Sequence, residues 1–183
     1  MALTWKCPDN VMELLDSVKN KNHPHLEQAN FVVAFNDAKP FVKNRLNWGN
    51  ISRFSEFNKI WQSEKYDFCV VICSDLWHSI LDNSQREPLL DLHLCRCNVE
   101  YIPETVIEGK KKQVVKDEWG RVKYTDEIKL DANGNPKWQV SPIDFAVLCK
   151  NVYRYGLWCS ELGAVKDVIT SAVLVDSTNE QTE

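Results

Sequence analysis

The stretch Asp91-Leu92-His93-Leu94-Cys95-Arg96-Cys97 decides the fold, because it places several reactive side chains within one helical pattern. Upstream, Ser84 and Glu87 stand three residues apart, which is the spacing of a capping box at the start of a helix. The leucines of residues 89–94 recur at helical spacing, so we expect them to be buried. The stretch therefore predicts a helix that packs against the core of the molecule.

Residues before this helix predict a buried sheet. Residues 31–35 and 67–73 are short runs rich in β-branched and aromatic side chains, as in strands, and the second run is apolar enough for the middle of a sheet. Residues 45–54 predict a further strand with Gly49 as a bulge. A helix is expected over residues 9–22, and shorter helical segments over residues 55–61 and 75–81.

The second half of the chain changes character at residue 99. Prolines, glycines and a turn at residues 131–136 divide residues 99–140, which predicts short strands joined by exposed turns, inserted at the edge of the domain. No internal repeat is evident. Ser141 and Pro142 then predict the N-cap and first turn of an amphipathic helix that ends at Gly156. A last helix is expected from residue 160 to 172, and residues 176–183 form a polar tail that we expect to be disordered.

Length and composition favour one domain over residues 1–175, and the expected helices and strands make it an α+β domain. The chain has 183 residues, of which 44% are hydrophobic, and a formal net charge of −4, which gives no sign of a nucleic-acid-binding protein. Seven cysteines without a recognisable secretion signal indicate reduced thiols in a cytoplasm. The longest apolar run, residues 68–73, is far shorter than the roughly 20 residues that span a bilayer, so no membrane partner is expected.

Short motifs along most of the chain resemble the phage metallopeptidase family. They are His23-Pro-His-Leu26, the strand at residues 66–68 leading to residues 75–77, the segment 85–91, and the segments 141–144 and 155–158. The resemblance implies a zincin-like fold, in which a small mixed sheet packs against helices. It also implies a zinc-binding helix with two histidines four residues apart, a glutamate after the first, and a third histidine on a later helix.

The metal positions that the resemblance implies carry other side chains here. The first histidine falls on Leu92, the general-base glutamate on His93, the second histidine on Arg96 and the third on Ile143. Leucine and isoleucine have no lone pair, and arginine remains a cation near neutral pH. The sequence therefore predicts an enzyme scaffold without catalytic residues, zinc or another cofactor.

An alternative metal site and an ion pair can be derived from the same helix. His93 and Cys97 are four residues apart and could hold a metal, with Cys95 or Asp144 as a further ligand, although cysteines beside leucines are more often core residues. A nucleophilic pair of His93 and Cys95 is disfavoured because these side chains leave different helix faces. Arg96 is expected to pair with Asp144 or Glu100 and so to join two helices where zinc would have joined them.

Residues 39–61 mix basic and aromatic side chains, a combination that single-stranded nucleic-acid binders use, but a solvated strand face is the preferred explanation. We expect a non-catalytic phage or prophage protein that binds a host protein in the bacterial cytoplasm, for instance as an inhibitor of host defence. The alternatives are a metal-dependent hydrolase built on His93 and Cys97, and a nucleic-acid-binding accessory protein. Candidate binding residues are Trp48, Arg53, Trp119 and Trp138.

Overall fold

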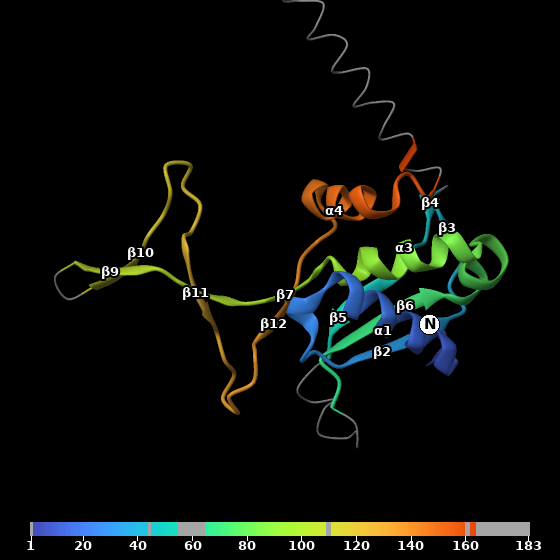
Figure 1. Cartoon of the computed structure of the whole chain (residues 1–183), viewed down its shortest axis with the longest axis horizontal. Coiled ribbons are helices and arrows are strands. Elements are labelled where there is room, and N and C mark those ends of the chain that lie inside the picture. Colours follow the sequence, from blue (N-terminus) through green and yellow to red (C-terminus); the bar gives the residue numbers. More distant parts are fainter. Residues whose placement is uncertain (1, 44, 55–64, 109–110, 160–161, 164–183) are drawn as a thin grey trace, which may run out of the picture. The chain divides into compact units, whose positions relative to one another are not determined.

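The computed structural model describes residues 2–43, 45–54, 65–108, 111–159 and 162–163, which form two compact units. The main unit comprises the described residues of 1–96 and 142–183, and the β unit comprises those of 97–141. Helices and strands are both well represented, so the predicted α+β class is confirmed (Figure 1). The β unit also confirms the β-rich insertion expected at residues 99–140, whereas a single domain over residues 1–175 stays a prediction.

A mixed sheet of four strands forms the centre of the main unit. Its order is β1 (Thr4–Lys6), β2 (Phe31–Asn36), β6 (Phe68–Cys73) and β5 (Asn50–Arg53). The central pair, β2 and β6, is parallel and the two outer pairs are antiparallel. Both central strands are mostly buried, as their continuous apolar sequences predict.

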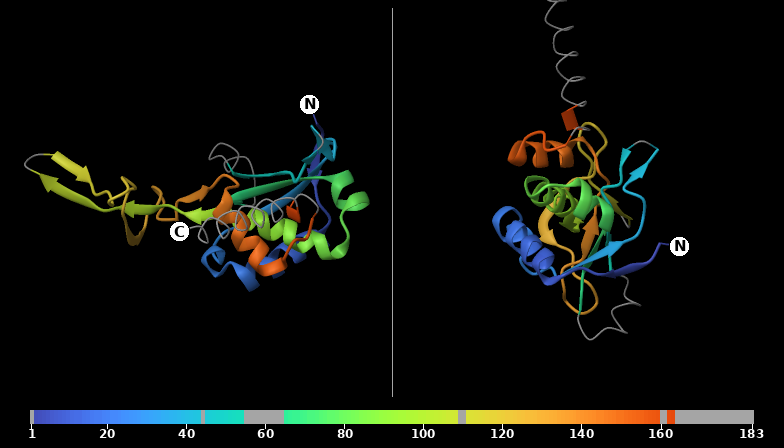
Figure 2. Two further views of the ribbon diagram at one scale, coloured as in Figure 1. Left: turned by 90° about the horizontal axis from the view of Figure 1, so that it is seen from above. Right: turned by 90° about the vertical axis from the view of Figure 1, so that its right-hand side faces the viewer.

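Three helices accompany this sheet, α1 (Asp9–Asn22), α3 (Asn83–Leu94) and α4 (Phe145–Tyr155). Helix α3 packs against α1 and α4 and lies between them (Figure 2). The predicted burial of its leucines is confirmed, but Asp91 and His93 are buried as well. A helix covered on several sides forces its polar residues to find partners inside the protein. No described helix has the length and apolar character needed to cross a membrane.

Two of the predicted helix starts are wrong by a few residues. Helix α3 is capped by Asp82 and not by Ser84: Asp82 Oδ1 accepts a hydrogen bond from the Gln85 amide (3.0 Å), and Gln85 Oε1 accepts one from the Asp82 amide (3.1 Å). Helix α4 begins after Asp144, whose Oδ1 accepts from the Val147 amide (2.9 Å). In both cases a nearby carboxylate takes the cap, because its charge also interacts favourably with the helix N-terminus.

The predicted strand over residues 45–54 is divided in the structure. Its first part, β4 (Arg45–Leu46), pairs with β3 (Phe41–Val42), and its second part is β5 in the main sheet. Gly49 lies between them with φ +82°, and a Cβ there would lie 2.1 Å from the Val71 carbonyl oxygen. Gly49 is therefore a point of close backbone approach and not the predicted bulge.

Other predictions about secondary structure are confirmed or lie outside the described residues. The predicted helix at residues 9–22 is α1, and the helical segment after β6 is η2 (Leu76–Ile80); a short turn, η1 (Pro24–Leu26), follows α1. The predicted helical segment at residues 55–61, nearly all of the helix at 160–172 and the tail at 176–183 lie outside the described residues.

The β unit is a long antiparallel ribbon. The outgoing path runs through β7 (Cys97–Val99), β8 (Tyr101–Pro103) and β9 (Thr105–Glu108). The returning path consists of β10 (Lys111–Val114), β11 (Tyr124–Ile128) and β12 (Trp138–Val140). Each returning strand pairs with one outgoing strand, in the pairs β9–β10, β8–β11 and β7–β12.

Two loops leave the returning path and repeat one design, which the turn residues of the sequence did not predict. In residues 115–123, Asp117 Oδ1 accepts from the amides of Trp119 (2.9 Å) and Arg121 (2.8 Å). In residues 129–137, Asp131 Oδ1 accepts from the amides of two asparagines, also two and four residues later (2.8 and 2.9 Å). Each loop has a glycine of positive φ three residues after its aspartate. We call them the Asp-turn loops.

Candidate functional site

The structure places the positions that the resemblance assigns to zinc in different surroundings. Leu92 lies in the core, and Ile143 is exposed ahead of α4. His93 is fully buried, and its Nε2 lies 2.8 Å from the Trp48 carbonyl oxygen. Because that oxygen can only accept, Nε2 carries the hydrogen, and burial lowers the pKa of His93 to about 4. His93 is thus a neutral core residue near pH 7.

Arg96 follows the end of α3, and the carboxylates expected to pair with it are engaged elsewhere. Asp144 caps α4. Glu100 accepts from Lys129 Nζ (2.6 Å) and Lys137 Nζ (2.9 Å). Arg96 Nη1 instead lies 3.4 Å from Asn50 Oδ1. Both carboxylates that were proposed for Arg96 thus have other partners, and the bridge between two helices stays a prediction.

The alternative pair of His93 and Cys97 depended on a helix that continues through both residues. Helix α3 ends at Leu94, and Cys97 lies in strand β7, so the helical spacing does not apply to them. Within the described part of the chain, the potential metal ligands that lie together are His23, Asp91 and Cys95. Neither His93 nor Cys97 belongs to this group.

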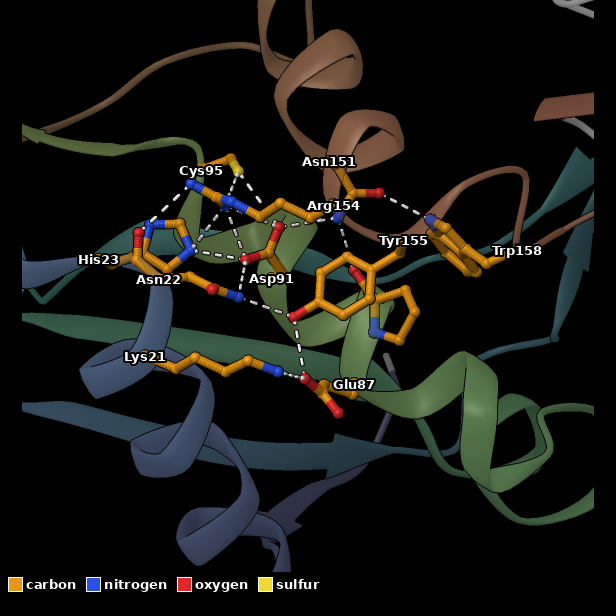
Figure 3. Close-up of polar contacts among 11 residues, drawn as sticks. Lys21, Asn22, His23, Glu87, Asp91, Cys95, Asn151, Arg154, Tyr155 and Trp158 are labelled. Carbon is orange, nitrogen blue, oxygen red and sulfur yellow. Dashed lines mark hydrogen bonds and ion pairs between the residues drawn. The ribbon is translucent and has the colours of Figure 1, made fainter.

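His23, Asp91 and Cys95 form a buried cluster around the side chain of Arg154 (Figure 3). Asp91 and Cys95 are four residues apart at the end of α3 and so lie on one helix face. His23 immediately follows α1, and Arg154 lies in the last turn of α4. One ligand atom from each of the first three residues lies within 4.8 Å of the others.

A single nitrogen of Arg154 contacts all three residues. Its Nη1 lies 2.8 and 3.0 Å from the two carboxylate oxygens of Asp91, 3.3 Å from Cys95 Sγ and 3.3 Å from His23 Nε2. Its Nη2 donates to the Asn22 carbonyl oxygen (3.3 Å). A permanent cation of the protein therefore occupies the centre of the His23–Asp91–Cys95 cluster.

Asp91 is a buried carboxylate with several donors. His23 Nε2 (2.8 Å), Asn22 Nδ2 (3.1 Å) and Asn151 Nδ2 (2.9 Å) all lie at hydrogen-bonding distance. Burial by itself raises the pKa of Asp91, but the hydrogen bonds from His23 and Asn151 and the charge of Arg154 outweigh it, so the pKa is lowered. Asp91 is thus ionised and paired, as a buried charge requires.

Further polar side chains hold the donors of Asp91 in place. Asn151 Oδ1 accepts from Trp158 Nε1 (2.6 Å). Tyr155 Oη accepts from Asn22 Nδ2 (2.8 Å) and donates to Glu87 Oε1 (3.1 Å). These contacts join the end of α1, helix α3 and helix α4 into one network, which is drawn in Figure 3.

Cys95 is not activated for nucleophilic chemistry. Burial and the negative charge of Asp91 raise the pKa of its thiol to about 12, against the smaller effect of Arg154. A nucleophilic cysteine needs a thiolate near neutral pH, and this environment favours the thiol. The cluster therefore has the residue types of a metal site but not the electrostatics of a cysteine hydrolase.

The four candidate binding residues differ in their surroundings. Trp138 is buried in the β unit, and Trp48 is half-buried with its ring centroid 6.1 Å from that of Trp158. Arg53 is exposed on β5. Trp119 is 71% exposed at the tip of the first Asp-turn loop, where the Arg121 guanidinium lies 4.7 Å from the ring centroid. Arg53 and Trp119 are thus the exposed members of this set.

Comparison with known proteins connects this geometry to a family. No curated protein and no solved structure matches the chain significantly. A family model described as "putative phage metallopeptidase" matches residues 3–173, a range that includes the cluster residues His23, Asp91 and Cys95 and also Arg154. Because this match covers nearly the whole sequence, the chain belongs to the phage metallopeptidase family.

Proposed function

We propose that this chain is a non-catalytic member of its family, encoded by a phage or prophage, that acts by binding a host protein in the bacterial cytoplasm. Inhibition of a host defence system is one role that suits such a protein. The observation that carries the proposal is the position of Arg154, whose guanidinium occupies the centre of the His23–Asp91–Cys95 cluster.

The residues at the family's metal positions do not fit zinc. A catalytic zinc ion takes three protein ligands through nitrogen, oxygen or sulfur atoms at about 2.0–2.3 Å. Leu92 and Ile143 offer no such atom, and Arg96 is a cation that repels a metal. Among the four positions only His93 has a nitrogen lone pair, on Nδ1, since its Nε2–H donates to the Trp48 carbonyl oxygen, and one ligand is too few for zinc. These positions support a scaffold role.

The β unit offers a surface for a protein partner. Residues directly opposite each other in a ribbon point to one face, and Tyr101 opposes Ile128, Pro103 opposes Tyr124 and Thr105 opposes Val114. We call the large apolar side chains of this face the apolar stripe: Tyr101, Ile107, Val114, Tyr124 and Ile128, which are between 41% and 75% exposed. Apolar side chains gathered on one exposed face are typical of an interaction site.

Metal analysis of protein purified without a histidine tag tests the non-catalytic part of the proposal. We expect well below one zinc per chain and no peptidase activity after zinc is added. About one tightly held zinc per chain would instead favour the metal-dependent hydrolase.

Capture of host proteins from a bacterial lysate tests the binding part. A protein that the chain retains should be lost after Ile107→Ser, Tyr124→Ser and Ile128→Ser are combined. It should be kept after Leu3→Ser and Tyr153→Ser, which also remove exposed apolar side chains but lie in the main unit. Equal retention by both variants contradicts the role of the stripe. Binding to single-stranded DNA that weakens steeply with salt would favour the nucleic-acid alternative.

A further inference from the structure

We propose that His23, Asp91 and Cys95 form a binding site for one divalent ion of the zinc class, and that Arg154 closes this site by occupying it. Metal and the Arg154 guanidinium would then exclude each other. The site is different from positions 92, 93, 96 and 143, which the family resemblance implies. The inference shares with the proposed function only the position of Arg154, and its test needs no partner protein.

The three side chains are a suitable donor set. An imidazole nitrogen, a carboxylate oxygen and a thiolate sulfur are all ligands that zinc accepts, and three protein ligands leave a fourth position open. All three residues are buried, and their ligand atoms already lie within 4.8 Å of one another. Asn151 and Asn22 hold the Asp91 carboxylate from outside the cluster, as outer partners do for metal ligands.

The distances are compatible with exchange of one cation for the other. Arg154 Nη1 lies 2.8–3.3 Å from the ligand atoms. Zinc would require about 2.0–2.3 Å, so each ligand would have to move inward by roughly 1 Å. The Arg154 side chain is 28% exposed, so it can leave the cluster toward solvent without crossing the core.

Charge is conserved in this exchange. With Arg154 in place, one carboxylate, one guanidinium and a neutral thiol sum to zero. When a divalent ion replaces Arg154, its two positive charges are balanced by the Asp91 carboxylate and the Cys95 thiolate, so the sum is again zero. The thiol proton of Cys95 passes to solvent. His23 must also move its ring hydrogen from Nε2 to Nδ1, because Nε2 now donates to Asp91 and would have to offer a lone pair to the metal.

The test replaces Arg154 by methionine, which has a similar reach but no charge. Cobalt and zinc are titrated into the wild-type chain and the Arg154→Met variant, and zinc affinity is measured by competition with a coloured chelator. We expect the variant to bind one ion per chain about 100-fold more tightly or better, because metal no longer has to displace a buried ion pair. The cobalt form should show a sulfur-to-metal charge-transfer band.

A matched pair of double variants identifies the sulfur ligand. Adding Cys95→Ser to Arg154→Met should remove the charge-transfer band and most of the affinity. Adding Cys149→Ser should leave both unchanged, because Cys149 is an exposed cysteine of the same helix as Arg154. A folded Arg154→Met variant that binds metal no better than wild type overturns the inference. A charge-transfer band that survives Cys95→Ser overturns it as well.

A variant that unfolds without metal also gives an answer. Circular dichroism is then recorded with and without zinc. Recovery of helix by Arg154→Met, but not by its Cys95→Ser derivative, supports the site, and absence of recovery overturns it. About one zinc per wild-type chain would contradict the proposed function and the closure by Arg154 together. Failure of Arg154→Met to bind metal contradicts the inference alone.

Discussion

At the scale of single residues, Asp91 is the charge around which the main unit is organised. Its carboxylate contacts Asn22 at the end of α1, His23 directly after it, and Asn151 and Arg154 of α4. A buried carboxylate tolerates few changes among its partners, because removal of one partner leaves a charge without compensation in a poorly solvated place. Asp91 of α3 therefore contacts residues at the end of α1 and in α4 through one buried charge.

Removal of Arg154 should measure how much its contact with Asp91 stabilises the fold. We expect Arg154→Ala to lower the free energy of unfolding by about 3 kcal/mol, since it breaks a buried ion pair. Lys21→Ala is the control in the same network: Lys21 is 67% exposed and pairs with Glu87 at 3.3 Å, so about 1 kcal/mol or less should be lost. Urea unfolding with a chelator present makes the comparison. Equal losses would show that Asp91 does not need Arg154.

His93 should make the main unit sensitive to acid. Its pKa is about 4 in the folded chain and near 6.5 when exposed, so the unfolded state takes up the proton first as pH falls. The contribution of neutral His93 to the free energy of unfolding is complete above pH 6.5 and is lost as the pH falls toward 4, by about 3 kcal/mol in total. His93→Gln, which keeps a donor for the Trp48 carbonyl, should show a flatter dependence of unfolding free energy on pH.

His78→Gln is the control for this measurement, because His78 is exposed. It should retain the acid sensitivity of the wild-type chain. If His93→Gln loses stability between pH 6.5 and 4 as steeply as His78→Gln does, then titration of His93 does not cause the effect.

At the scale of elements, the strand and helix interiors could be predicted from the sequence and their ends could not. Strands β2 and β6 come from short apolar runs, and α1 comes from apolar residues at helical spacing. Each of these patterns fits one type of secondary structure. The start of α3 was predicted at Ser84, whereas Asp82, two residues earlier, caps the helix in the structure. The sequence likewise could not indicate the close contact between Gly49 and Val71.

The cap of α3 can be tested by a pair of substitutions. Asp82→Ala should cost about 1 kcal/mol of unfolding free energy, because it removes the acceptor for the Gln85 amide. Ser84→Ala should cost less, since the Ser84 hydroxyl only donates to Asp82 Oδ1 (2.6 Å). Thermal unfolding compares the two. A larger loss of unfolding free energy for Ser84→Ala would indicate that Ser84 is the N-cap.

Gly49 is expected to be the most restrictive glycine of the main unit. Gly49→Ala should lower the free energy of unfolding by more than about 2 kcal/mol, because positive φ and a clash with the Val71 carbonyl act together. Gly156→Ala is the control, since Gly156 also has positive φ but a Cβ added there would meet no atom within 4 Å. Chemical unfolding of both variants isolates the clash. If both variants lost the same unfolding free energy, the positive φ would account for the whole loss and the clash with Val71 for none of it.

At the scale of the whole molecule, the fold class and the β-rich insertion could be predicted, whereas the cluster around Arg154 could not. Asp91 and Cys95 stand at helical spacing in the sequence, so their shared face was accessible to inspection. His23 and Arg154 join them across 68 and 63 residues, and only the packing of α1 and α4 against α3 brings them there. Nothing in the sequence predicts that Arg154 contacts buried residues, because an arginine near the end of an amphipathic helix is ordinarily solvated.

The two Asp-turn loops have a practical consequence for engineering. Each is closed at its base by a backbone hydrogen bond, from Lys123 to Val115 (3.0 Å) and from Lys137 to Lys129 (2.8 Å), and is tied internally by its own aspartate. Such self-contained tips accept foreign residues more readily than the ribbon that carries them. A short epitope inserted next to Gly120 or Gly134 would therefore be displayed at the tip of a closed loop, where an antibody or a dye can reach it.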